Sequence, residues 1–178
     1  MAGDLAGLWP SPVHRCKAGG KLSRRGAFVG TLTLPSGGSV YLDTSAIIYS
    51  VERIEPYLSL LAPAWQAAET GRFDLVCSEL TIAETLVGPF RAGDRALETA
   101  CREVFAAPEM QIVPATRELW EGAARLRAET GLKLADALHA ATALRIGCGL
   151  FITNDADFRR IADLSSLVLD DLLSDGQQ

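Results

Sequence analysis

The sequence has few cysteines and histidines, and they are scattered. Its four cysteines, at positions 16, 77, 101 and 148, form no C-x-x-C pair, and only two histidines are present. This pattern is typical neither of a zinc site nor of a disulfide framework, and it fits a reducing compartment. We therefore expect a cytoplasmic protein.

Long apolar runs are also missing. No stretch approaches the ~18 residues needed to span a bilayer, so we predict no membrane association. Arg24 and Arg25, followed by the apolar stretch 26–34, faintly resemble a twin-arginine export signal. Two threonines interrupt that stretch and no small-residue cleavage site follows it, which favours a plain extension over a signal.

Positive charge is scarce after the first 38 residues. The chain carries 17 Lys and Arg against 22 Asp and Glu, for a net charge of −5, and five of the basic residues lie in 1–38. The remainder is acidic, so any nucleic-acid role would need a local basic rim or metal ions. Residues 1–38 are rich in Gly, Pro, Ser and Arg without periodicity, and we predict that they form an N-terminal extension dispensable for folding.

The remaining residues, 39–178, are predicted to form a single domain, because 178 residues with 48% hydrophobic content suit one core. Short β-branched or apolar runs alternate there with helical patterns. Helices are expected at 46–51, 56–70, 79–87, 94–106, 116–130, 133–146 and 157–162, and strands at 40–42, 73–77, 111–113, 150–153 and 167–169. Gly88-Pro89 is expected to end the third helix. The alternation predicts an α/β fold of three layers, α/β/α, around a central parallel twisted sheet.

Four acidic residues come from segments that should meet at one edge of this sheet. Asp43 ends the first strand, Asp155 follows the strand 150–153, Glu84 lies one to two turns into a helix and Asp136 lies in the first turn of another. Taken singly, Asp43 and Asp155 could cap helices, Thr81-x-x-Glu84 matches a capping box, and Asp136 could complement a helix dipole for ~0.3–1 kcal/mol. Taken together, such carboxylates repel one another and need a cation.

A ligand set of oxygen atoms without cysteine or histidine favours hard ions over zinc. The ion expected here is Mg²⁺, with Mn²⁺ as the alternative. The chain has no glycine-rich phosphate loop. Carboxylate-held magnesium then indicates metal-assisted hydrolysis of a phosphodiester, and the ions would let an acidic domain meet an anionic substrate.

Four segments carry a resemblance to a known family. Residues 41–49 (YLDTSAIIY), 78–89 (SELTIAETLVGP), 134–144 (LADALHAATAL) and 151–158 (FITNDADF) resemble the signature blocks of PIN-domain ribonucleases, in particular VapC-type toxins of bacterial toxin-antitoxin pairs. The resemblance runs from residue 39 to about residue 170. It departs from the family in the long extension before Ser39.

The resemblance implies a PIN-like fold and a Mg²⁺-dependent endoribonuclease that hydrolyses RNA, binds a cognate antitoxin and forms a homodimer. By it, the catalytic and metal-binding set would be Asp43, Glu84, Asp136 and Asp155, with Asp157 as a further acid and Thr44, Ser45 and Asn154 as supporting polar groups.

Other residues receive more modest interpretations. His139 shares a helix face with Asp136 but is interpreted as a packing residue, since one histidine without a second is seldom a ligand. Trp65 and Trp120 are interpreted as core or dimer contacts. We expect the dimer patch on the apolar helix that holds Leu58, Leu60, Leu61 and Trp65, and RNA phosphate contacts at Arg91, Arg95 and Lys133.

Two alternatives remain. A catalytically silent PIN-like RNA-binding or interaction module would be expected to have lost at least one of the four acids. A phosphotransfer enzyme of the dehalogenase type also begins with an aspartate after its first strand, but it needs a second aspartate two residues later, where this chain has Ser45.

Overall fold

Five parallel strands form one sheet at the centre of the fold. The structure is a computed structural model that describes residues 31–174. The strands are β1 (Ser39–Leu42), β2 (Asp74–Ser78), β3 (Met110–Val113), β4 (Leu150–Thr153) and β5 (Ser166–Val168), in the order β3-β2-β1-β4-β5. β1 is central and reads as an almost continuous apolar run, as expected for a strand covered on both faces.

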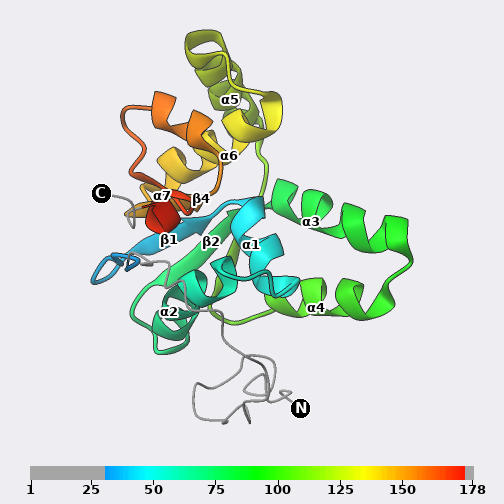
Figure 1. Cartoon of the computed structure of the whole chain (residues 1–178). Helices are drawn as coiled ribbons and strands as arrows, with labels where there is room; N and C mark the ends of the chain where they lie inside the picture. The colour runs from blue at the N-terminus through cyan, green and yellow to red at the C-terminus, as the bar shows by residue number, and fades with distance from the viewer. Residues whose placement is uncertain (1–30, 175–178) are drawn as a thin grey trace.

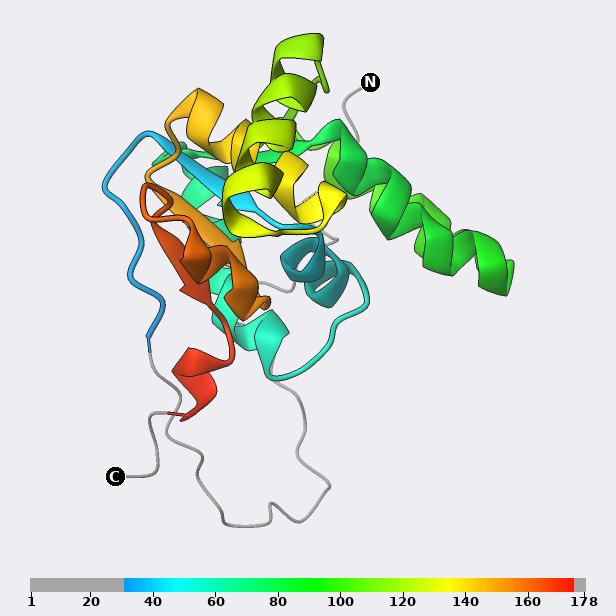
Figure 2. The ribbon, with the colours of Figure 1, turned by 90° about the horizontal axis from the view of Figure 1, so that it is seen from above.

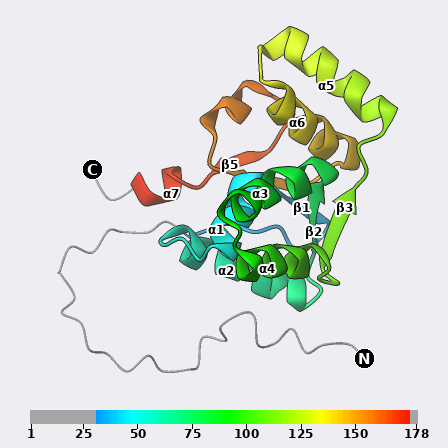
Figure 3. The same cartoon turned by 90° about the vertical axis from the view of Figure 1, so that its right-hand side faces the viewer.

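Helices cover both faces of the sheet. They are α1 (Thr44–Val51), α2 (Tyr57–Glu69), α3 (Glu79–Ala92), α4 (Arg95–Phe105), α5 (Arg117–Thr130), α6 (Leu134–Ile146) and α7 (Asp171–Ser174), with a 3₁₀ helix η2 (Ala156–Arg160). Helices α2 and α4 lie on one side of the sheet and α5 and α6 on the other (Figure 1, Figure 3). The predicted three-layer α/β/α fold is confirmed.

Alternate residues of β1 divide the core into two parts. Val40 and Leu42 pack with Leu61 and Trp65 of α2, whereas Tyr41 packs with Leu138 of α6 on the opposite face. This follows from the two-residue period of a strand. The part on the Tyr41 side lies beneath the helix that carries Asp136.

Helix α3 is longer than predicted. The expected stop at Gly88-Pro89 is wrong, because α3 continues to Ala92 and ends where Gly93 adopts a left-handed φ of 65°. Gly88 has no Cβ to clash with the proline ring, which relaxes the restriction that proline places on the residue before it. The Asp94 N–H then donates to the Pro89 carbonyl at 3.0 Å and closes the helix end. Helices α3 and α4 form a hairpin that projects beyond the sheet (Figure 1, Figure 2).

The N-terminal boundary is partly described. Leu32 is 6% exposed and packs in the core, so at least this part of the segment 1–38 contacts the domain. Residues 1–30 and 175–178, including Arg24 and Arg25, lie outside the described residues, and dispensability stays a prediction for residues 1–30. Within residues 31–174 no helix is long and apolar enough to cross a membrane.

Candidate active site

Asp43 is fixed at the carboxyl end of β1 by three donors. Its Oδ1 accepts the Thr44 N–H at 2.8 Å, and its Oδ2 accepts the hydroxyls of Ser45 at 3.1 Å and Thr153 at 2.7 Å. Thr153 ends the adjacent strand β4, where the Asp43 N–H also donates to the Ile152 carbonyl. Asp43 caps α1, which was the alternative to a metal-binding role for this residue. It is 8% exposed and lies at the same sheet edge as the other acids.

Glu84 reaches from α3 toward the start of α1. Its Oε2 accepts the Thr44 hydroxyl at 2.5 Å and lies 2.9 Å from His139 Nε2. Burial alone would raise the pKa of Glu84, but these two hydrogen bonds outweigh burial and hold that pKa below its ordinary value. The capping-box alternative for Glu84 fails, because Ser78 is the residue that caps α3.

His139 lies between the two carboxylates. It is 2% exposed, its Nδ1 is 2.9 Å from the Tyr41 hydroxyl, and its Nε2 is 3.9 Å from Asp43 Oδ1. The predicted packing residue is therefore buried, and it also contacts the candidate site directly.

Asp136 lies within electrostatic reach of two other acids. Burial first, then the negative charge of Asp155, and to a smaller extent that of Asp43, raise the pKa of Asp136, and Lys133 opposes the shift. In the described part of the chain no hydrogen-bond donor reaches the Asp136 carboxylate. Asp155 caps η2 by accepting the Asp157 N–H at 2.8 Å. The four predicted acids thus meet at one edge of the sheet.

The chemistry of this donor set fits a hard divalent cation. The donors are carboxylate oxygens, and the charges of Asp155 and Asp43 add to burial in raising the pKa of Asp136. A bound cation would relieve this repulsion. As the side chains stand, no group of three or more Asp, Glu, His or Cys residues within 31–174 is arranged to hold a metal ion. Binding would therefore require the carboxylates to turn toward a common point.

The supporting residues differ in their distance from the acids. Thr44 and Ser45 contact Glu84 and Asp43, whereas the Asn154 side chain binds the Tyr49 hydroxyl and the Asp170 N–H. Asp157 pairs with Arg160 at 2.8 Å.

The three basic residues predicted to contact RNA also differ in their distance from the acids. Lys133 occupies the N-cap position of α6, three residues before Asp136, and its side chain makes no capping hydrogen bond. Arg91 lies in the last turn of α3 and Arg95 is the first residue of α4, so both lie at the turn between these helices. Arg91 is seven residues after Glu84, about 10 Å along the helix axis.

Two contacts at the site were not predicted from the sequence. The Thr153 hydroxyl donates a hydrogen bond to the Asp43 carboxylate, and the Tyr41 hydroxyl lies within hydrogen-bond distance of His139 Nδ1. Thr153 and Tyr41 carry hydroxyl groups in the largely apolar strands β4 and β1. Each lies within one of the four segments that resemble the PIN-domain signatures. A buried hydroxyl in a core strand is the signal that could have identified them, because it needs a partner.

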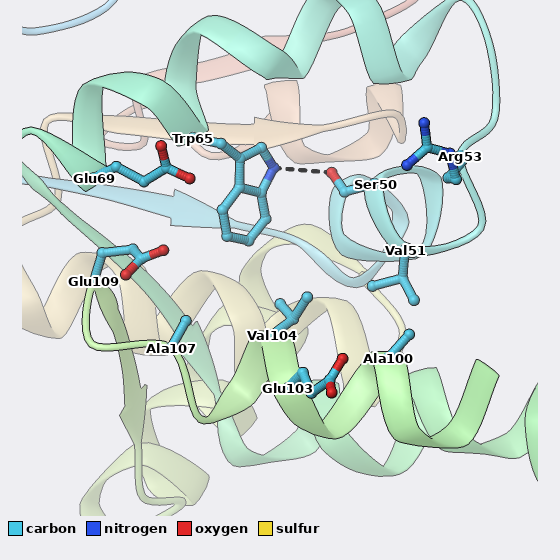
Figure 4. A pocket seen from close by; sticks show the side chains of 10 residues that line it. All are labelled: Ser50, Val51, Arg53, Trp65, Glu69, Ala100, Glu103, Val104, Ala107 and Glu109. Carbon is cyan, nitrogen blue, oxygen red and sulfur yellow. Dashed lines mark hydrogen bonds between the residues drawn. The ribbon is translucent and has the colours of Figure 1, made fainter. Parts of the chain in front are cut away.

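A separate cavity of about 180 Å³ lies at the opposite end of α1, between α1, α2 and α4 (Figure 4). Its floor is apolar, and Trp65 donates its indole N–H to the Ser50 hydroxyl at 3.0 Å. Burial and the charge of Glu109 raise the pKa of Glu69. The lining residues are Ser50, Val51, Arg53, Trp65, Glu69, Ala100, Glu103, Val104, Ala107 and Glu109.

A scan of the chain against protein families matches the PIN domain over residues 40–164. The chain belongs to the PIN-domain family. The predicted membership is confirmed, and the match spans all four acids. A search of curated proteins gives no match.

Solved structures with the same fold include toxin-antitoxin proteins. The VapBC2 complex of Rickettsia felis bound to a promoter DNA fragment contains a chain that is 18% identical with a TM-score of 0.58, covering 73% of this chain and 98% of that one. The VapC20 toxin of Mycobacterium tuberculosis, which cleaves the sarcin-ricin loop, is 16% identical with a TM-score of 0.58, covering 67% and 92%. A toxin-antitoxin complex from Klebsiella pneumoniae contains a chain that is 24% identical with a TM-score of 0.51, covering 73% and 97%. At these identities the likeness establishes the fold.

Proposed function

We propose that this PIN domain is a Mg²⁺-dependent endoribonuclease that hydrolyses RNA phosphodiester bonds. Membership in the PIN family supports a nuclease, and so a hydrolase. The observation that carries the proposal is the arrangement of carboxylates at the carboxyl ends of parallel strands, in which Asp43 and Glu84 share contacts with Thr44 and His139. Burial first, and then the charges of Asp155 and Asp43, raise the pKa of Asp136 there. Such a cluster of like charges calls for a cation.

Asp43, Glu84, Asp136 and Asp155 would hold the cation, which is Mg²⁺ or alternatively Mn²⁺. When bound, the ion activates water for attack on phosphorus and neutralises charge on the scissile phosphate. Asp43 and Glu84 are already oriented by hydroxyl and imidazole donors, and Asp155 by the Asp157 N–H, whereas no donor within residues 31–174 fixes the Asp136 carboxylate. Lys133, exposed beside Asp136, would contact an RNA phosphate.

The experiment is an RNA cleavage assay with Mg²⁺ on the wild type and on Asp43→Asn, Glu84→Gln, Asp136→Asn and Asp155→Asn. We expect all four variants to lose cleavage. Asp74→Asn is the matched control, because Asp74 is exposed at the start of β2, at the opposite edge of the sheet, and it should keep most activity. RNA binding without cleavage in the wild type would favour the alternative of a catalytically silent RNA-binding module.

We further propose that the protein is the toxin of a type II toxin-antitoxin pair, acting in the cytoplasm under the control of a cognate antitoxin. Folds of this kind occur in toxin-antitoxin complexes from Rickettsia felis and Klebsiella pneumoniae. The cavity of Figure 4 has the chemistry of a docking site for an apolar antitoxin segment flanked by basic residues. Val51 and Val104, both partly exposed, offer the apolar surface, and Glu69, Glu103 and Glu109 outnumber Arg53.

This docking site can be tested apart from catalysis. Glu103→Lys should weaken capture of a co-expressed antitoxin while RNA cleavage by the free toxin continues. Glu129→Lys, an exposed change of the same charge on α5, should leave capture intact. Equal capture by both variants would place the antitoxin elsewhere.

A homodimer is also proposed, but through a different surface from the one predicted. The patch expected on α2 is not available, because Leu60, Leu61 and Trp65 are buried in the core. Val87 and Phe90 of α3 share one face, and Phe90 is 57% exposed. Sedimentation should give a dimer for the wild type and a monomer for Phe90→Asp, and a monomeric wild type would contradict the proposal.

A further inference from the structure

We propose that Tyr41 and His139 are positioning residues that hold Glu84 with one defined oxygen toward the cation. This inference rests on the proposed nuclease function. It concerns two side chains that neither the sequence analysis nor the family resemblance assigned to the site.

The contacts form a chain of hydrogen bonds from the sheet to the carboxylate. Tyr41 of β1 and His139 of α6 are both buried, and the Tyr41 hydroxyl lies 2.9 Å from His139 Nδ1. His139 Nε2 in turn lies 2.9 Å from Glu84 Oε2 on α3. These contacts connect β1, α6 and α3, which are distant in sequence, at the Glu84 side chain.

The donors and acceptors can be ordered along this chain. The Thr44 hydroxyl donates to Glu84 Oε2, so this oxygen acts as an acceptor. His139 Nε2 faces the same oxygen at 2.9 Å as its second donor, and Nδ1 faces the Tyr41 hydroxyl at 2.9 Å. A tyrosine hydroxyl can donate to an imidazole nitrogen. The order of contacts therefore runs from Tyr41 through His139 to Glu84.

The arrangement distinguishes the two oxygens of Glu84. The Thr44 hydroxyl and His139 Nε2 both donate to Oε2. In the described residues no donor reaches Oε1, which is left as the oxygen for a cation. A free glutamate side chain has several rotatable bonds, so two fixed donors remove much of its freedom before any cation binds.

Packing alone does not require these polar atoms. The Tyr41 ring stacks on Phe151, with centroids 5.0 Å apart and an interplanar angle of 7°, a contact that a phenylalanine could also make. A buried hydroxyl and imidazole cost desolvation unless they are bonded, and here their bonds lead to a candidate metal ligand. Polar partners of metal ligands typically contribute 10–100-fold in metal affinity or activity.

The test compares Tyr41→Phe, His139→Leu and His139→Gln with the wild type. The first two remove only the hydroxyl and the imidazole donor, respectively, and the glutamine amide can still donate to Glu84. Thr142→Val is the matched control, since Thr142 is buried on the same helix and its hydroxyl bonds only the Leu138 carbonyl. Two quantities are measured for each protein: Mn²⁺ affinity of the metal-free protein by calorimetry, and the Mg²⁺ concentration that half-activates RNA cleavage.

We expect His139→Leu to weaken Mn²⁺ binding about tenfold or more and to raise the half-activating Mg²⁺ concentration by a similar factor. His139→Gln should recover most of the loss, and Tyr41→Phe should shift both quantities in the same direction by less. In the His139→Leu background, Tyr41→Phe should add no further loss, because the chain of bonds is already broken.

Unchanged Mn²⁺ and Mg²⁺ dependence in Tyr41→Phe and His139→Leu, with only a lower melting temperature, would overturn the positioning role. If His139→Leu does not fold, Tyr41→Phe alone decides, and wild-type metal affinity in that variant would also overturn it. A wild-type protein that neither binds Mn²⁺ nor cleaves RNA is a different result, which overturns the proposed function and this inference with it.

Discussion

Replacing Asp43 by alanine should destabilise the metal-free fold as well as abolish cleavage. The substitution removes the cap of α1, worth ~0.5–2 kcal/mol. It also leaves the buried Thr153 hydroxyl without the oxygen that it contacts at 2.7 Å, at a cost of ~1–3 kcal/mol. Relief of repulsion with Asp136 offsets part of this loss. We therefore expect Asp43→Ala to lower the free energy of unfolding by about 2–4 kcal/mol.

Asp43→Asn provides the comparison that isolates the metal function. Asparagine can keep the cap of α1 through its amide oxygen, but its NH₂ group then faces the Ser45 and Thr153 hydroxyls, which must rotate to accept from it. Its cost should therefore be smaller than that of alanine, about 1 kcal/mol. Urea unfolding of both variants at neutral pH in EDTA gives the two free energies, and RNA cleavage is measured on the same samples. Equal stability of the alanine and asparagine variants would refute the assigned hydrogen bonds, and cleavage by Asp43→Asn would refute the role of its charge.

Three further predictions concern other parts of the chain. Because the pKa of Asp136 is raised in the folded protein, its ionisation costs stability at neutral pH, so Asp136→Asn should melt at a higher temperature than wild type in EDTA. That gain should vanish as the pH falls through the pKa values of the carboxyl in the folded and unfolded states, and a lowered melting temperature at pH 7 would contradict it. A chain starting at Thr31 should melt like the full chain, whereas one starting at Ser39 should lose ~2 kcal/mol with the buried Leu32, and equal melting of the two would contradict this. Gly93→Ala should cost ~1 kcal/mol in urea unfolding because of its φ of 65°, and no loss would mean that the end of α3 adapts.

The layers of the fold could be predicted because each depends on local patterns. Apolar runs such as β4 and helical patterns such as α6 alternate along the chain, and that alternation implies parallel strands. The end of α3 could not be predicted from the same rules. Gly88 permits a helical conformation before Pro89, but whether the chain adopts it depends on the tertiary packing of the buried Pro89, which a local pattern does not contain.

The candidate site, like the fold, could be predicted only in part from the sequence. Asp43 and Asp155 could be placed together because parallel strands end at one edge of the sheet. The bond between Tyr41 and His139 joins residues 98 positions apart, and it depends on how α6 is rotated against the sheet. The sequence indicated that His139 shares a helix face with Asp136. It did not indicate which side chains of β1 and α3 this face would contact.

The central claim is hydrolysis of RNA by cation-activated water at the four carboxylates, and the chemistry of the cleaved ends tests it most directly. Attack by water leaves fragments with an ordinary phosphate monoester, whereas attack by the ribose 2′-hydroxyl leaves a 2′,3′-cyclic phosphate. End analysis of an RNA cut in Mg²⁺ by the wild-type protein should find monoester ends alone, with no cutting in EDTA. Cyclic phosphate ends, or cutting that persists in EDTA, would contradict the account.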